Sequence, residues 1–182
     1  ESAVALAAGP DRLVHGWLST YASGAVQRPE GRIAYGVGTT EYARHRDCAA
    51  ITVECGQHAD PTAPEVARTA IDNVLAVLGL DSGAESRALP PIDRPIELIE
   101  LVRVHDRLDE GDRFERGWRS FDRVDAGAPD AHRADGTVLA AEEDGWVLFP
   151  NPATPVGREW FYLARRSERD VAGAAARLTL TR

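Results

Sequence analysis

Apolar residues recur every three or four positions in two stretches of the chain, which predicts two helices. The first covers residues 11–22, and the second follows Thr62. Thr62 and Glu65 have the spacing of a capping box, and Gly79 comes directly after the last apolar turn. Alternation of apolar and small residues predicts a short strand at residues 32–37.

Residues 49–56 are apolar and β-branched on both faces, which is typical of a strand covered on both sides in a mostly parallel sheet. We expect this segment to be a central strand. Together with the capped helix that follows, it would form half of an α/β unit. Residues 81–95 then combine turn-forming residues, charges and three prolines, the composition of a linker.

Beyond the linker the pattern changes to short strands separated by turn signals such as Asp135-Gly136 and Asp144-Gly145. The expected strands are residues 96–105, 118–124, 137–141, 146–149, 160–164 and 177–181. We therefore expect an α/β portion at residues 1–80, a linker at 81–95 and an all-β barrel or sandwich at 96–182. The predicted fold class is α+β overall.

Composition narrows the range of functions. The chain has 182 residues with 29 acidic and 21 basic side chains, a net charge of −8, so a nucleic-acid partner is not expected. Every basic residue is arginine; the absence of lysine excludes a Walker-type phosphate loop, a Schiff-base enzyme and a lipoyl or biotinyl carrier. No apolar run is long enough to span a membrane.

The methionine and cysteine content of the chain gives two further expectations, one on its origin and one on its location. It contains no methionine, so we expect it to be a piece of a longer protein. Cys48 and Cys55 are seven residues apart in one extended segment, which places them on opposite faces and makes a disulfide between them geometrically poor. Reduced thiols and the absence of an apparent leader favour a cytoplasmic location.

Glu54 is the main candidate for chemistry. It is the last but one residue of the predicted central strand, and ligands of open α/β sheets bind at the carboxyl ends of strands. A partly buried carboxylate at that edge suits a general base and acid. A structural glutamate paired with a neighbouring arginine is an equally good interpretation of the position alone.

The sequence resembles the succinylglutamate desuccinylase and aspartoacylase family over most of its length. The resemblance is most specific where Thr39-Thr40 and Arg44 precede Glu54-Cys55-Gly56, the arginine ten residues before the glutamate. Weaker matches are Ile96-Glu97-Leu98-Ile99-Glu100 and Asp144-Gly145-Trp146-Val147-Leu148-Phe149-Pro150. The resemblance implies a zinc-carboxypeptidase-like α/β domain, here only a remnant, followed by a barrel-sandwich hybrid domain. It also implies zinc-assisted hydrolysis of the amide bond of an N-acyl amino acid, a small-molecule substrate.

The resemblance assigns roles to three residues, Glu54, Arg44 and Tyr162; a fourth, His58, is a candidate from its position alone. Glu54 falls on the glutamate that takes a proton from the attacking water and delivers it to the leaving nitrogen. Arg44 falls on an arginine that binds a substrate carboxylate, although a surface salt bridge is the alternative interpretation. Tyr162 is the candidate for a tyrosine that closes over the substrate, with a packed core aromatic as the alternative. His58, close behind Glu54, is a candidate for orienting the substrate.

The family's zinc ligands have no counterpart in this sequence, because none of the five histidines begins a His-x-x-Glu motif. We therefore assign no metal ligand in this chain and expect the ligands in a preceding segment. The chain alone is then expected to be inactive. An incomplete α/β sheet would also leave an apolar face bare, which predicts self-association into a homo-oligomer. The alternative function is a non-catalytic module that shapes substrate access or subunit contacts.

Overall fold

A computed structural model of the chain describes residues 1–25, 38–57, 59–80 and 95–169. The described residues form two compact units, each treated by itself below. The first contains Glu1–Leu13 and the described parts of Thr39–Glu97 and Glu168–Arg182. The second contains the described parts of Val14–Gly38 and Leu98–Ser167. Residues 14–25 thus group with the β half of the chain, whereas the expected linker at 81–95 lies almost wholly outside the described residues.

The first unit is built from three helices, α1 (Ser2–Ala7), α3 (Thr39–Arg44) and α4 (Ala63–Val77). Helix α1 packs against α4, and the buried residues Leu6, Ala7 and Ala70 supply its small apolar core. The predicted helix after Thr62 is therefore confirmed. Its predicted capping box is wrong, because the Thr62 hydroxyl donates to Asp60 Oδ1 at 2.7 Å and makes no side-chain cap.

Helix α4 has apolar residues on two neighbouring sides. One side packs inward through Ala70, whereas Ile71, Leu75 and Leu78, spaced four and three residues apart, form an exposed stripe. Their side chains are 59%, 38% and 54% exposed. Burying such a stripe against a second molecule would be favourable, so self-association of the chain remains a prediction that light scattering can check.

The predicted central strand at residues 49–56 is not formed. This segment has no regular secondary structure, and Thr52, Val53 and Glu54 are all exposed. The reason lies in its hydrogen bonds: the Ala50 amide donates to Glu1 Oε1, and the Ala50 carbonyl accepts from Arg44 Nη2. Among the described residues, side chains thus satisfy the backbone polar groups of Ala50 that a neighbouring strand would satisfy in a sheet.

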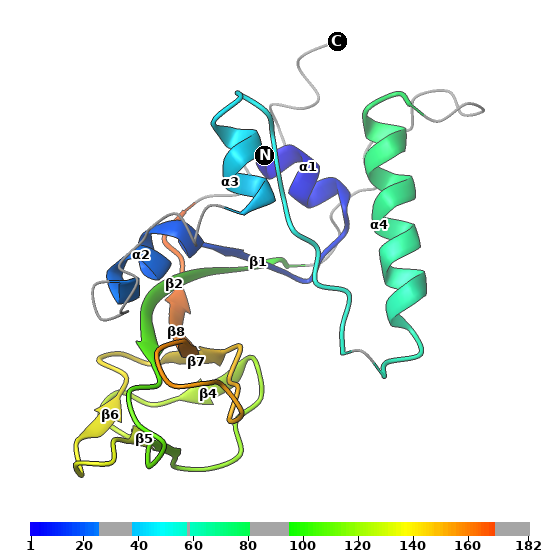
Figure 1. The fold of residues 1–182 in the computed structure, drawn as a ribbon. Helices are drawn as coiled ribbons and strands as arrows, with labels where there is room; N and C mark the ends of the chain where they lie inside the picture. The colour runs from blue at the N-terminus through cyan, green and yellow to red at the C-terminus, as the bar shows by residue number, and fades with distance from the viewer. Residues whose placement is uncertain (26–37, 58, 81–94, 170–182) are drawn as a thin grey trace. The chain divides into compact units, whose positions relative to one another are not determined.

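The second unit consists of two antiparallel sheets and helix α2 (Trp17–Ala25), as Figure 1 shows. The larger sheet has the strand order β1-β2-β8-β7-β4, and the smaller has the order β3-β5-β6. The strands are β1 (Arg12–His15), β2 (Glu97–Asp106), β3 (Arg113–Phe114), β4 (Asp122–Val124), β5 (Pro129–His132), β6 (Val138–Ala140), β7 (Gly145–Leu148) and β8 (Glu159–Arg166).

Strand β8 is the centre of this unit, and its residues alternate between two apolar clusters. Tyr162 and Ala164 pack with Trp146 of β7 in one cluster. Phe161 and Leu163 lie in the other cluster. Trp160 and Phe161 are among the largest fully buried side chains of the described chain. Successive side chains of a strand face opposite sides, and this produces a pattern that can be recognised in the sequence. The expected strands accordingly overlap β2, β4, β6, β7 and β8. The last expected strand, 177–181, lies outside the described residues, as does that at 32–37.

The predicted helix at residues 11–22 is partly wrong. The chain pairs first as β1, turns at Gly16, and becomes helical only at Trp17. Gly16 has φ +87°, and a Cβ there would lie 2.9 Å from the Leu101 carbonyl oxygen. This close approach to β2 requires glycine and ends any continuous helix. Strands β3 and β5 were not expected, because two to four residues give too little alternation to detect.

The class of the fold is mixed α/β, with few helices. The strands of the described residues form two open sheets, and no closed barrel is seen among them, so the barrel-sandwich expectation is not confirmed. No helix in the described ranges is both long and apolar enough to cross a membrane.

Asp130 is a buried carboxylate with an unusual environment. It is 1% exposed and is the extra residue of a bulge in β5, between Pro129 and Ala131. Neither carboxylate oxygen has a hydrogen bond of good geometry within the described chain. Burial raises the pKa of Asp130 to about 6, although the Ala141 amide acts in the opposite direction. The folded state therefore holds this proton more tightly than the unfolded chain does.

Replacing Asp130 with asparagine is expected to stabilise the protein at neutral pH. Because the pKa of the folded state is raised, stability is greatest below the unfolded pKa and falls as the pH rises through about 6. The D130N variant carries no such charge and should gain about 2 kcal/mol at about pH 7, with little gain near pH 4. Urea unfolding at both pH values measures the difference. A variant less stable than the parent at neutral pH contradicts this explanation.

Candidate functional site

Glu54 lies in the first unit, in the extended segment that leads to α4. Its side chain is exposed, and the strand expected to bury it is absent. Two residues further on, Gly56 has φ +122°, and a Cβ there would lie 3.1 Å from Asp60 Oδ2. This glycine turns the chain away from the segment, so Glu54 lies shortly before a fixed bend. Glu54 is thus not partly buried, and no ion pair joins it to an arginine of the described residues.

Arg44 ends helix α3 and is held by two carboxylates and a carbonyl. Its Nε donates to Glu1 Oε1 at 2.5 Å, its Nη1 to Glu41 Oε1 at 2.7 Å, and its Nη2 to the Ala50 oxygen at 2.9 Å. Glu41 is only 5% exposed. Burial acts to raise the pKa of Glu1, but hydrogen bonds from Arg44 and the Ala50 amide outweigh it and hold that pKa below its usual range. Arg44 therefore fixes the start of the segment that carries Glu54.

Replacing Arg44 with glutamine is expected to loosen this segment. The buried Glu41 carboxylate would lose its cation and the Ala50 carbonyl its donor, at a cost of about 1–2 kcal/mol. Hydrogen exchange at the α3 amides should accelerate correspondingly. Arg68→Gln is a matched control, because Arg68 forms an exposed ion pair with Asp72 that contributes little. Equal effects of the two variants contradict a positioning role for Arg44.

Tyr162 lies in the second unit, on β8, and is 2% exposed. Its ring stacks on Trp17 with the centroids 4.9 Å apart and meets Phe149 edge to face at 6.2 Å. Trp17 and Phe149 are themselves 39% and 38% exposed. The structure therefore shows Tyr162 as a packed aromatic beneath two half-exposed rings. A substrate would contact its side chain only after one of those rings moved.

The four predicted site residues are thus brought together only in part. Arg44 and Glu54 share one unit and are linked through Ala50, whereas Tyr162 belongs to the other unit. His58 lies outside the described residues. The roles of Glu1 and Glu41, whose carboxylates accept hydrogen bonds from Arg44, were not predicted from the sequence. The spacing of Glu41 and Arg44, three residues apart on a helix, is the signal that could have indicated their pairing.

The described residues do not fit a zinc site. No group of three or more histidine, cysteine, aspartate or glutamate side chains in these ranges is arranged to hold a metal ion. Cys48 and Cys55 are free thiols. A structural or catalytic zinc needs three or four such ligands around one point. No step of a reaction can therefore be derived through a metal held by these residues.

Comparison with solved structures shows what the fold resembles. A succinylglutamate desuccinylase from Vibrio cholerae matches with a TM-score of 0.55 and 21% identity, over 70% of this chain and 37% of that one. The enzyme of the same name from Vibrio parahaemolyticus matches with a TM-score of 0.56 and 21% identity, over 71% and 38%. The chain shares its fold with part of a desuccinylase. It spans less than two fifths of either structure. No protein-family model and no curated protein matches the sequence.

Proposed function

We propose that the chain is part of a hydrolase of the succinylglutamate desuccinylase and aspartoacylase family, which cleaves the amide bond of an N-acyl amino acid. The observation that carries the proposal is the shared fold, which extends over 70% of this chain. The spacing of Arg44 and Glu54 supports it. The two residues lie in one unit, and the arginine holds the backbone that leads to the glutamate.

In the proposed reaction Glu54 moves one proton. Its carboxylate takes the proton from the attacking water while the water oxygen bonds to the amide carbon. The same proton then passes to the amide nitrogen as the carbon–nitrogen bond breaks, which yields a carboxylic acid and an amine. The acid then gives up the second proton of the water, which the released amine takes up, so the final products are a carboxylate and an ammonium group. An exposed carboxylate before a fixed turn is accessible to both water and substrate.

Arg44 is proposed to bind a carboxylate of the substrate. In the structure Glu1 occupies one edge of its guanidinium, and both side chains of that pair are 41% exposed. A pair exposed to that degree exchanges partners at low cost, so a substrate carboxylate would replace Glu1 while Glu41 stays bound. Tyr162 and His58 are further proposed substrate contacts, and the two-sheet unit is proposed to correspond to the barrel-sandwich domain.

Zinc is the proposed cofactor, and its ligands are proposed to lie outside this 182-residue chain. The corresponding test uses the 182-residue chain itself, supplied with zinc and N-succinylglutamate. We expect no release of free amine and no tightly bound zinc, because the described residues offer no ligand set. Fluorescamine detection of the amine and metal analysis after gel filtration provide the measurements. Turnover, or one retained zinc per chain, overturns the proposed division of the site.

A further inference from the structure

A hollow of about 760 Å³ lies between the two sheets of the second unit. Its walls come from β2 and the β2–β3 loop, from β6 and the β5–β6 turn, and from the end of α2. Its volume falls in the usual range of small-molecule sites. Arg44, Glu54 and Tyr162 do not line it. We call it the β2–β6 hollow. Its charged and titratable lining residues are Arg103, His105, Asp109, Asp112, Arg133 and Asp135.

One part of the β2–β6 hollow is positive. The His105 ring packs on Phe161 with the centroids 4.8 Å apart, and its buried Nε2 has no hydrogen-bond partner within the described residues. Burial and then the charges of Arg133 and Arg103 lower the pKa of His105 to about 4. The imidazole is therefore neutral at physiological pH and lies in the field of two guanidinium groups.

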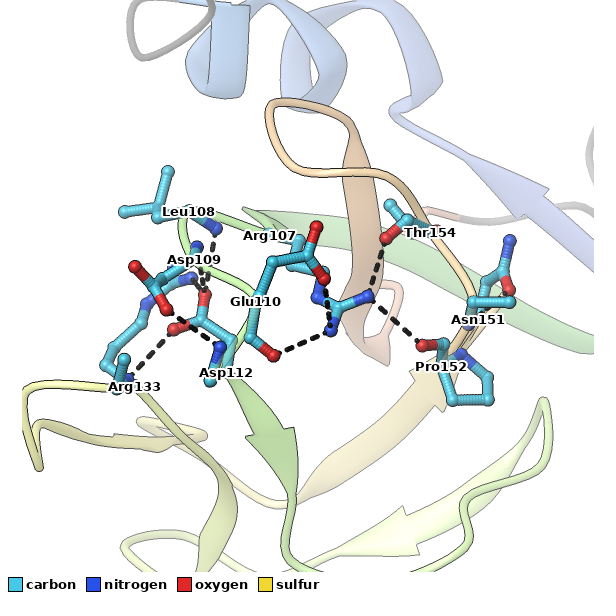
Figure 2. A network of polar contacts seen from close by, with 12 residues as sticks. Arg107, Leu108, Asp109, Glu110, Asp112, Arg133, Asn151, Pro152 and Thr154 are labelled. Carbon is cyan, nitrogen blue, oxygen red and sulfur yellow. Dashed lines mark hydrogen bonds and ion pairs between the residues drawn. The ribbon is translucent and has the colours of Figure 1, made fainter.

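The two arginines differ in how firmly they are held. Arg133 is 11% exposed and donates to the Asp106 carbonyl at 2.7 Å and to Asp112 at 2.6 Å, as Figure 2 shows for the Asp112 contact. Arg103 is 49% exposed, and its only described ion pair is with Glu142, which is 77% exposed. Arg133 is thus part of the wall, whereas Arg103 is able to exchange Glu142 for another carboxylate.

Another part of the hollow is negative. Asp109 Oδ1 accepts the Gly111 amide at 2.7 Å, and Asp135 Oδ1 accepts the Thr137 amide at 2.8 Å. The Thr137 amide and hydroxyl hold the pKa of Asp135 below its usual range, so it is ionised at neutral pH. Unlike Asp112, which Arg133 neutralises, Asp109 and Asp135 have no ion pair with a cation in the described structure. Both side chains are exposed, so their carboxylates are accessible to a ligand.

We propose that the β2–β6 hollow binds a free amino acid as its zwitterion, the carboxylate at Arg103 and the ammonium group at Asp135. Opposite charges within one hollow favour a ligand that carries both over a simple anion or a simple amine. The inference concerns the second unit alone and does not depend on the proposed hydrolysis.

An NMR titration of the isotope-labelled 182-residue chain tests this proposal with three probes: L-glutamate, succinate and butylamine. Glutamate is expected to shift the amides of Ala134 and Thr137 and to bind about tenfold more tightly than either of the others. Asp135→Asn, which keeps the acceptor for the Thr137 amide, should weaken glutamate binding about tenfold and leave succinate unchanged. Arg103→Gln should weaken both glutamate and succinate.

Two matched controls separate a specific site from general charge effects. Asp60 accepts the Thr62 amide as Asp135 accepts that of Thr137, so Asp60→Asn should leave glutamate binding unchanged. Arg165 pairs with Glu143 and with Glu100 and does not line the hollow, so Arg165→Gln should also have no effect. The proposal fails if glutamate shifts neither amide, if succinate binds as tightly as glutamate, or if a control variant weakens binding as much as its counterpart.

Discussion

Gly145→Ala is expected to destabilise the two-sheet unit by about 3 kcal/mol, the upper end of the usual cost of overpacking. Gly145 begins β7, and a Cβ there would lie 2.0 Å from the Ala164 carbonyl oxygen of β8. The obstacle is backbone, so relief requires separation of β7 from β8, the pair that holds Trp146 and Leu148 in the core. Urea unfolding followed by tryptophan fluorescence measures the loss.

Gly117→Ala is the control for this prediction. Gly117 is exposed, and a Cβ there would meet no atom within 4 Å, so its substitution should change stability by less than about 0.5 kcal/mol. If Gly145→Ala proves as harmless as Gly117→Ala, the register of β7 against β8 is wrong.

Glu54→Gln is expected to lower kcat/KM of the full-length protein for an N-acyl amino acid by about 10²- to 10⁴-fold. The amide side chain has the same shape but cannot accept the proton of the attacking water. Because Glu54 is exposed and its segment is held through Ala50 and Arg44, the fold should be unaffected. Circular dichroism and the unfolding midpoint check that expectation alongside the kinetic assay.

Glu65→Gln is the control for the kinetic effect. Glu65 is also exposed and lies in the first turn of α4, so its loss removes the same charge from the same unit. Activity should then stay within a factor of about two. If Glu54→Gln is as active as the parent, the general-base role is wrong, and a non-catalytic module that shapes substrate access becomes the better interpretation.

The strands of the β half could be predicted because their signal is local. In β2, β7 and β8 the side chains that face the apolar clusters produce the alternation of the sequence. Residues of the same segments are paired in the observed strand register. The first 25 residues show the opposite case. The apolar spacing of residues 11–22 suits a helix, but residues 12–15 form β1 beside β2, and the close approach of Gly16 to Leu101 delays the helix until Trp17. That contact joins residues 85 positions apart, which no local pattern reveals.

In the candidate site, too, only the features with a local signal could be predicted. The positions of Arg44 and Glu54 followed from spacing within a short segment. The pairing of Arg44 with Glu1, across 43 residues, and the exposure of Glu54 did not, because both depend on how distant segments pack. The β2–β6 hollow was missed for the same reason, since three separate stretches contribute its charged residues.

The proposed function is tested most directly by measuring the free amine that the full-length protein releases from N-succinylglutamate. The assay is run before and after treatment of the protein with a metal chelator. The proposed function predicts hydrolysis that the chelator abolishes and added zinc restores. Hydrolysis that survives complete metal removal, or no hydrolysis of any N-acyl amino acid by the metal-loaded protein, contradicts it.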